Sequence, residues 1–187
     1  PSVIDAVDDP EVSVPRTGGT VSILTNDTLN GNPATPSNVT VTIDNDGGLT
    51  GLTVDSTGKL VVPNNTTPGT YTITYKICDK LDANVCDTAT AKIKVTPTIK
   101  ANDDPDTTVG GGGIVDILSN DRLNGNPVTP TDVAITIPND GGLTGLTVDN
   151  TTGKLKVPTN ATPGTYEVTY KICAVGGTTT CDTAKVK

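Results

Sequence analysis

The stretch PGTYTITYKIC, from Pro68 to Cys78, indicates the fold class of this chain. After the Pro-Gly turn, Tyr or Ile stands at every second position from Tyr71 to Ile77, and Thr or Lys stands between them. A period of two is that of a β-strand with one buried face. The stretch returns as PGTYEVTYKIC from Pro163 to Cys173. The chain therefore contains the same half-buried strand twice, and in both copies we expect the tyrosine face to point into a core.

Repetition extends over the whole chain. ILTNDTLNGNP (residues 23–33) returns as ILSNDRLNGNP (117–127), and IDNDGGLTGLTVD (43–55) returns as IPNDGGLTGLTVD (137–149). A period of about ninety-five residues predicts two homologous modules. We place them at residues 1–97, with 1–10 as an incoming linker, and at 98–187, with 98–105 as the inter-module linker. The last strand of the second module is shorter than that of the first, which predicts two units cut from a longer array.

Short strands separated by turn residues predict a β-sandwich. The chain has 20 Gly, 14 Pro and four Tyr as its only aromatic residues, so the core must be built from small aliphatic side chains. Candidate strands in the first module are residues 11–14, 20–24, 39–43, 52–55, 59–62, 71–78 and 86–95. We predict an all-β fold of two tandem immunoglobulin-like β-sandwich modules of about seven strands each, arranged end to end. Gly58 and Gly153 stand where tight hairpins need a left-handed residue.

The four cysteines predict two disulfides. Cys78 lies on the outward face of its strand and Cys86 on the outward face of the next, so a short hairpin brings the two sulfur atoms together. By the same argument Cys173 pairs with Cys181, which is typical of an oxidising compartment. The alternative is a metal site, but two thiols per module without histidine are too few ligands unless modules pair.

The motifs ANDDP, ILSND and PGTYEVTYKIC together resemble the immunoglobulin-like and cadherin-like repeats of large bacterial cell-surface adhesins. The resemblance covers both modules, although many such repeats lack the cysteine pair. It implies a secreted stalk, often stiffened by calcium, with target binding supplied by a separate domain. The start of each long strand also resembles the tyrosine corner of immunoglobulin-like folds, which implies that the Tyr71 and Tyr166 hydroxyl groups bond to upstream backbone.

Oxygen-rich loops provide candidate calcium ligands at the incoming end of each module. In a sandwich of this strand order the loop after residue 24 returns beside the incoming linker, and Ca²⁺ prefers carboxylate, amide and carbonyl oxygens. The candidates are Asp8, Asp9, Asn26, Asp27, Asn102, Asp103, Asp104, Asn120 and Asp121. The competing interpretation is that these side chains cap turns. DNDGG at residues 44–48 is not an EF-hand loop, because Pro138 replaces Asp44 in the second copy and no glutamate follows at the twelfth position.

Several functions are disfavoured. The chain has no histidine, which is the commonest general base, and we expect no enzyme and no required cofactor. A net charge of −8 repels nucleic acid and anionic membranes, and no apolar run is long enough to insert in a membrane. Lys76 and Lys171 raise the possibility of isopeptide crosslinks to asparagine, but their outward parity argues against it.

Glycan attachment is a further expectation. Asn-x-Ser/Thr triplets and Asp-Thr-Ala triplets mark the candidate sites Asn26, Asn38, Asn64, Asn65, Asn150, Asn160, Thr88 and Thr183.

The sequence thus favours an extracellular or cell-surface extension module that presents a distal binding domain. Its partners would be neighbouring repeats of the same chain and a surface or cell target that the sequence does not identify. Two alternatives remain open: a filament subunit assembled by strand donation, and a module that binds a ligand directly.

Overall fold

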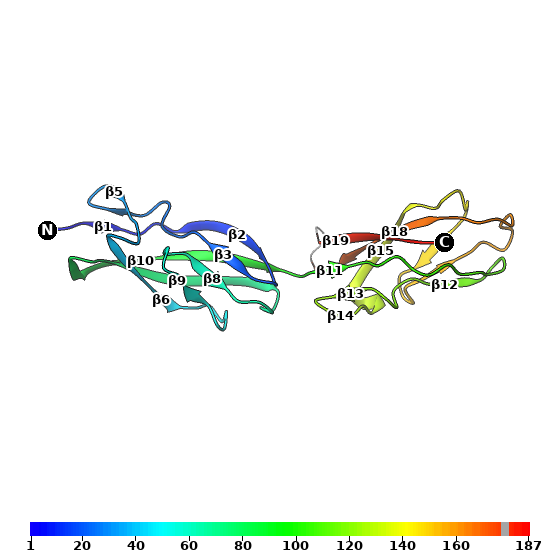
Figure 1. Cartoon of the computed structure of the whole chain (residues 1–187), viewed down its shortest axis with the longest axis horizontal. Helices are drawn as coiled ribbons and strands as arrows, with labels where there is room; N and C mark the ends of the chain where they lie inside the picture. The colour runs from blue at the N-terminus through cyan, green and yellow to red at the C-terminus, as the bar shows by residue number, and fades with distance from the viewer. Residues whose placement is uncertain (177–179) are drawn as a thin grey trace. The chain divides into compact units, whose positions relative to one another are not determined.

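A computed structural model describes residues 1–176 and 180–187 (Figure 1). The chain forms two compact units, Pro1–Thr96 and Pro97–Lys187. Apart from one turn of 3₁₀-helix at Pro130–Asp132, all regular structure in the described residues is β-strand. The predicted all-β class is confirmed, and each unit is a β-sandwich.

Unit 1 consists of two main sheets and a small third one. The four-stranded sheet has the order β2 (Asp9–Pro15), β10 (Asp82–Thr96), β9 (Gly69–Asp79) and β6 (Val39–Asn45). The second sheet has the order β3 (Gly19–Val21), β8 (Leu60–Val62) and β7 (Thr53–Val54). The third consists of β1 (Ile4–Asp5), β4 (Thr28–Leu29) and β5 (Asn32–Pro33). Each of the seven strands expected from the sequence overlaps a strand of the two main sheets.

Unit 2 repeats most of this plan. One sheet has the order β15 (Val133–Asn139), β18 (Val168–Ala174) and β19 (Cys181–Val186). The second has the order β12 (Ile114–Asp116), β17 (Lys154–Lys156) and β16 (Thr147–Asp149). The third consists of β11 (Ile99–Lys100), β13 (Arg122–Leu123) and β14 (Asn126–Pro127). Residues 104–110, which correspond to β2, form no strand here.

The core of each unit lies between its main sheets. In β9, Ile73, Tyr75 and Ile77 are fully buried while the residues between them are only partly covered, as the alternation predicts. They pack against residues of the opposite sheet, such as Leu60. Burying one such aliphatic side chain contributes about 1.5–3 kcal/mol. The tyrosine corners are also present: the Tyr71 and Tyr166 hydroxyl groups each donate a 2.5 Å hydrogen bond, to the carbonyl oxygens of Thr67 and Thr162.

The repeated polar loop forms a β-hairpin. Asn30 and Gly31 both have positive φ, 52° and 77°, as a two-residue type I′ turn requires. This hairpin, β4–β5, then pairs with β1, where Ile4 lies opposite Leu29. Part of residues 1–10, which the sequence marks as a linker, is thus a strand of unit 1. Residues 98–105 are likewise bound to unit 2 through β11 and β13.

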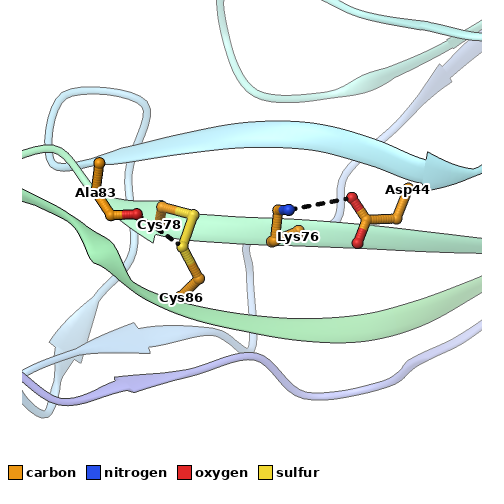
Figure 2. A network of polar contacts seen from close by, with 5 residues as sticks. All are labelled: Asp44, Lys76, Cys78, Ala83 and Cys86. Atoms are coloured by element: carbon orange, nitrogen blue, oxygen red, sulfur yellow. Dashed lines mark hydrogen bonds and ion pairs between the residues drawn. A yellow bond between two sulfur atoms is a disulfide. The ribbon is translucent and has the colours of Figure 1, made fainter.

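Both disulfides predicted from the sequence are present. Cys78 and Cys86 are directly opposite on β9 and β10, with Cα atoms 4.1 Å apart, and Cys173 and Cys181 are opposite on β18 and β19. Figure 2 shows the first disulfide on the sheet face, with the sulfur of Cys86 3.3 Å from the carbonyl oxygen of Ala83. The described residues include no free cysteine, so the alternative of a thiolate metal site is not supported.

We expect the double variant Cys78→Ser/Cys86→Ser to lower the free energy of unfolding of unit 1 by about 2–3 kcal/mol, because the disulfide closes a short loop in the unfolded chain. Chemical denaturation followed by residue-resolved NMR would separate the two units. Thr72→Ser, on the same exposed face, is the control and should change little. An unchanged midpoint for the double variant would show that the hairpin is equally constrained without the bond.

Candidate functional site

The candidate site of unit 1 lies where the incoming segment meets the loop after β3. The side-chain amide of Asn26 donates hydrogen bonds to the carbonyl oxygens of Val7 and Asp8, both at 3.1 Å. The backbone N–H of Val7 donates to Oδ1 of Asp27 at 2.7 Å. The predicted adjacency of the Asp8-Asp9 segment and the Asn26-Asp27 loop is therefore present.

Unit 2 repeats this arrangement. The amide of Asn120 donates to the carbonyl oxygens of Asn102 and Asp103, at 3.2 and 2.9 Å. The backbone N–H of Asn102 donates to Oδ1 of Asp121 at 2.8 Å. Because two copies with different neighbouring residues adopt the same contacts, the arrangement is a property of the shared motif.

A buried tyrosine hydroxyl group lies at the centre of each cluster. The hydroxyl oxygen of Tyr75 is 3.0 Å from Oδ2 of Asp9, 3.1 Å from Oδ2 of Asp27 and 3.0 Å from the carbonyl oxygen of Ile23. Asp27 is 1% exposed. One hydroxyl hydrogen serves only one acceptor at a time. The cluster therefore holds more acceptor oxygens than the hydroxyl group alone can satisfy.

In unit 2 the Tyr170 hydroxyl oxygen is 3.2 Å from Oδ2 of Asp121 and 2.9 Å from the carbonyl oxygen of Ile117. Asp121 is 0% exposed. The alternation along each strand predicts that Tyr75 and Tyr170 lie in the core, but it does not connect them with the acidic loops. A signal was available, since a buried tyrosine needs a partner for its hydroxyl group.

Burial makes these carboxyl groups harder to ionise. Burial raises the pKa of Asp9 to about 6; the hydrogen bond from Tyr75 opposes this effect, and the charges of Asp27 and Asp8 add to it. Burial likewise raises the pKa of Asp104 to about 6, with the charge of Asp121 adding to the effect. Burial also raises the pKa of Asp27 and of Asp121. The pKa of Tyr75 and of Tyr170 is raised by burial and then by the neighbouring carboxylates, so both hydroxyl groups stay protonated.

Other side chains fasten the incoming segment to each unit. Asn30 exchanges two hydrogen bonds with Val3: its backbone N–H donates to the Val3 carbonyl oxygen, and its Oδ1 accepts from the Val3 N–H, both at 2.7 Å. Asn124 does the same with Thr98, at 2.8 and 3.0 Å. Asp87 and Asp182 accept from the backbone N–H of Ala6 and Ala101, each at 2.9 Å. This role of the four side chains was not predicted from the sequence.

Several calcium candidates have structural partners. Asp8 accepts a 2.8 Å hydrogen bond from the N–H of Thr90, and Asp103 accepts one of the same length from Lys185. Each of these contacts joins residues 82 positions apart, so they hold the incoming segment to a distant strand and are not the turn caps that the competing interpretation expects. Among the described residues, no group of three or more His, Cys, Asp or Glu side chains is placed to hold a metal ion. Three buried oxygens nevertheless have no hydrogen-bond partner: Oδ1 of Asn26, Oδ1 of Asn120 and Oδ2 of Asp104.

Lys76 is on the sheet face, as its parity predicts. Its Nζ lies 3.6 Å from Oδ1 of Asp44, and the two side chains are 40% and 38% exposed (Figure 2). A lysine this exposed lacks the buried setting that an isopeptide crosslink needs, so the structure does not support that chemistry at this position.

The candidate glycan sites divide into two groups. Asn64, Asn65, Asn150, Asn160, Thr88 and Thr183 are exposed. Asn26 and Asn38 are only partly exposed, and the Asn38 amide donates to the carbonyl oxygen of Pro33 at 3.3 Å. Asn150 is also engaged, because its Oδ1 accepts from the N–H of Ile135 at 2.8 Å. Asn64, Asn65 and Asn160 are therefore the exposed asparagine candidates other than Asn150.

No protein-family model matches this chain, and neither does any curated protein sequence. Similar solved structures include the ectodomain of human desmocollin-1, with 18% identity and a TM-score of 0.44 over 100% of this chain and 42% of that one. They also include the first two extracellular domains of chicken VE-cadherin, with 16% identity and a TM-score of 0.39 over 95% of this chain and 96% of that one.

A third similar structure is a SusE-like, surface-located polysaccharide-binding protein from the heparin utilisation locus of Bacteroides thetaiotaomicron. It has 15% identity and a TM-score of 0.38 over 98% of this chain and 33% of that one. These similarities concern the fold alone. Among the described residues, no helix has the length and apolar character needed to span a membrane.

We expect the free energy of unfolding, in buffer with a calcium chelator, to fall as the pH rises from 5 to 7. The raised pKa of Asp9 and Asp104, about 6 in the folded state, means that folding favours their protonated forms. Their stabilising contribution is therefore lost as the pH rises through 6. Hydrogen bonds within turns lower the pKa of Asp55 and of Asp149. These two groups therefore make the free energy of unfolding rise with pH, but only at a pH below this range.

The variants Asp9→Asn and Asp104→Asn should flatten this pH dependence, because the amide carries no charge. Asp46→Asn, in an exposed turn, is the matched control and should retain it. Urea denaturation at several pH values measures the slope. If both cluster variants keep the parental slope, these two carboxyl groups are not its source.

Proposed function

We propose that this chain is a non-catalytic extension module of a secreted or cell-surface protein, in which tandem units form a stalk that presents a distal binding domain. The observation that carries the proposal is the parallel pairing of β2 with β10 in unit 1. Val12 lies opposite Ile93 and Val14 opposite Val95, so the first and last long strands run in the same direction (Figure 1).

Parallel first and last strands place the incoming and outgoing segments of a unit at opposite ends. A unit of this kind lengthens a chain instead of folding it back. With strands of eight to ten residues at about 3.3 Å per residue, each unit would add roughly 26–33 Å. Neighbouring repeats are then the natural partners at the two ends.

The disulfides support an extracellular setting for the proposed stalk. Bonds of this type persist in oxidising compartments and are rare in the cytosol. They also reinforce units whose cores contain few large side chains, since Tyr75 is the only fully buried aromatic residue among those described in unit 1. Covalent reinforcement suits a protein that must stay folded away from the cell.

Small-angle X-ray scattering tests the stalk. We expect a monomer whose radius of gyration is clearly above the roughly 16 Å of a single compact globule of 187 residues. Polymers that resist dilution would instead support a filament subunit assembled by strand donation. A monomer with a compact radius of gyration would contradict the stalk and favour a module that binds a ligand directly.

We also propose that Ca²⁺ binds at the incoming end of each unit. Asp9, Asp27 and Asn26 would hold it in unit 1, and Asp104, Asp121 and Asn120 in unit 2. The support comes from the buried oxygens without hydrogen-bond partners and from the raised carboxyl pKa values, since both describe a site rich in acceptors and poor in donors. A bound cation would supply the missing positive charge and fasten the incoming segment.

We expect millimolar Ca²⁺ to raise the thermal midpoint at pH 7.5 and to raise it less at pH 5, where protons compete for the carboxylates. At a hundredfold excess over Kd the gain is about 2.7 kcal/mol. The variant Asp103→Ala/Asp104→Ala should lose the calcium-dependent shift of unit 2, whereas Asp46→Ala should keep it. If the wild type shows no shift, or the double variant keeps the full shift, this assignment is wrong.

A further inference from the structure

The strand β6 of unit 1 is an edge strand whose outer side is open. The sheet order β2, β10, β9, β6 gives it a neighbour on one side only. The carbonyl oxygen of Asn38 accepts a hydrogen bond from the N–H of Lys80, which follows β9. Alternation along an antiparallel strand then directs the backbone polar groups of Val39, Val41 and Ile43 away from β9. In the part of the chain that the structure describes, no strand or side chain pairs with β6 on that side.

Unit 2 closes the corresponding edge with a side chain. The N–H of Ile135 in β15 donates to Oδ1 of Asn150 at 2.8 Å, and the Asn150 amide donates to the Ile135 carbonyl oxygen at 3.5 Å. Asn150 follows β16, and Ser56 stands in its place in unit 1. Ile135 is 3% exposed, whereas its counterpart Val41 is only partly buried. An amide thus takes the place of a strand in unit 2, and the same edge of unit 1 has no such cover.

The sequence of β6 does not protect this edge. Proteins usually blunt exposed edge strands with proline, lysine or a bulge. From Val39 to Ile43 the strand has none of these: its register against β9 is continuous, and the residues alternate between aliphatic and threonine side chains. Thr40 and Thr42 are exposed on the outward face. The edge is therefore regular, uncharged over this range and accessible to another strand.

We propose that the outer edge of β6 is an interface for a second copy of this chain, in which the two β6 strands pair antiparallel about a twofold axis at Val41. The Val41 N–H of each copy donates to the carbonyl oxygen of the partner's Val41. The Ile43 N–H donates to the carbonyl oxygen of the partner's Val39. The Val39 N–H takes no part, because it already donates to the carbonyl oxygen of Thr35 at 3.0 Å. Two units then share one continuous sheet.

The alternation along β6 suits this register. It places Thr40 opposite the partner's Thr42 on the outward face, where threonine pairs stabilise neighbouring strands. On the inward face Val39 lies opposite the partner's Ile43, so apolar side chains meet. A shift of one residue would turn the partner's apolar side chains to the outward face. The pattern therefore selects one pairing.

The charges at the edge are also compatible with the pairing. Asp44 is the only ionisable side chain of β6, and its Oδ1 lies 3.6 Å from Nζ of Lys76 in the same unit (Figure 2). In the proposed register Asp44 lies opposite the partner's Asn38. No carboxylate of one strand therefore faces a carboxylate of the other.

A single pair of strands of seven residues buries little surface, so the association is weak and reversible. The chain therefore stays a monomer in dilute solution. Copies attached to one surface have a higher effective concentration, which favours the pair. On the proposed stalk, pairing would join neighbouring copies side by side. That consequence rests on the proposed function, whereas the pairing itself does not.

Sedimentation of the whole chain tests the pairing. We expect the weight-average mass to rise from monomer toward dimer between about 10 µM and about 1 mM, and to fall again on dilution. Thr40→Lys/Thr42→Lys places like charges opposite each other in both threonine pairs and should weaken the association about tenfold. Thr40→Glu/Thr42→Glu should do the same. An equimolar mixture of the two variants should associate at least as tightly as the wild type, because opposite charges then face each other.

The matched control is Ala134→Lys/Thr136→Lys, at the corresponding exposed positions of β15. It should leave the association unchanged, because Asn150 covers that edge. The mixture also guards against misfolding, since misfolded variants would not regain the association when combined.

A chain that stays monomeric up to about 1 mM overturns the proposal. So does a lysine variant that associates like the wild type, or a mixture that does not regain the association. If the monomeric chain instead binds a free Thr-Val-Thr-Val-Thr peptide, with slower amide exchange at Val41 and Ile43, the edge accepts a strand of another protein and the second-copy assignment is wrong. Scattering in dilute solution keeps the two hypotheses apart, because an elongated monomer that never pairs contradicts only this inference.

Discussion

The parallel pairing between β2 and β10 is the constraint on which unit 1 depends. The first and last long strands of the unit become neighbours in one sheet, with Val14 opposite Val95. A parallel pair cannot be closed by a tight turn, so the whole sandwich must be built between its two members. This single register buries Ile93 against the core and sends the incoming and outgoing segments to opposite ends. Because its two strands are separated by most of the sequence of the unit, the pair joins the two ends of that sequence within one sheet.

The polar cluster that holds the incoming segment in place contains more buried acceptor oxygens than donors. Asp27 is buried, Asp9 is half-buried beside it, and the Tyr75 hydroxyl group has one hydrogen for several acceptors. In return, the Asp27 carboxylate fixes the backbone of Val7, and the amide of Asn26 fixes the two carbonyl groups that follow. Burial in this cluster raises the pKa of Asp9 to about 6, so the cluster takes up a proton near that pH. The same side chains therefore position the incoming segment and couple its attachment to pH.

Sequence reasoning worked where a feature depends on local periodicity. The alternation from Tyr71 to Ile77 gave the buried face of β9, and the opposed outward positions of Cys78 and Cys86 gave the disulfide. It was less successful with the small sheets. Strands of two residues, such as β1 and β4, are too short to show a period in the sequence. Their pairing depends on the Asn30-Gly31 turn, which places β4 beside the incoming segment. The adjacency of the acidic loops followed from strand order, whereas the tyrosine hydroxyl group within them did not.

By itself the sequence determined the all-β class, the duplication, the inward face of each long strand and the cysteine pairing, while a resemblance to immunoglobulin-like folds implied the tyrosine corners. These features follow from spacing within one strand or between neighbours along the chain. Only the tertiary structure decided that the marked linkers contain bound strands and that Asp27 and Asp121 are buried against tyrosine. Each of these depends on contacts between residues far apart in the sequence. Such contacts form only when sheets pack, and no local period encodes them.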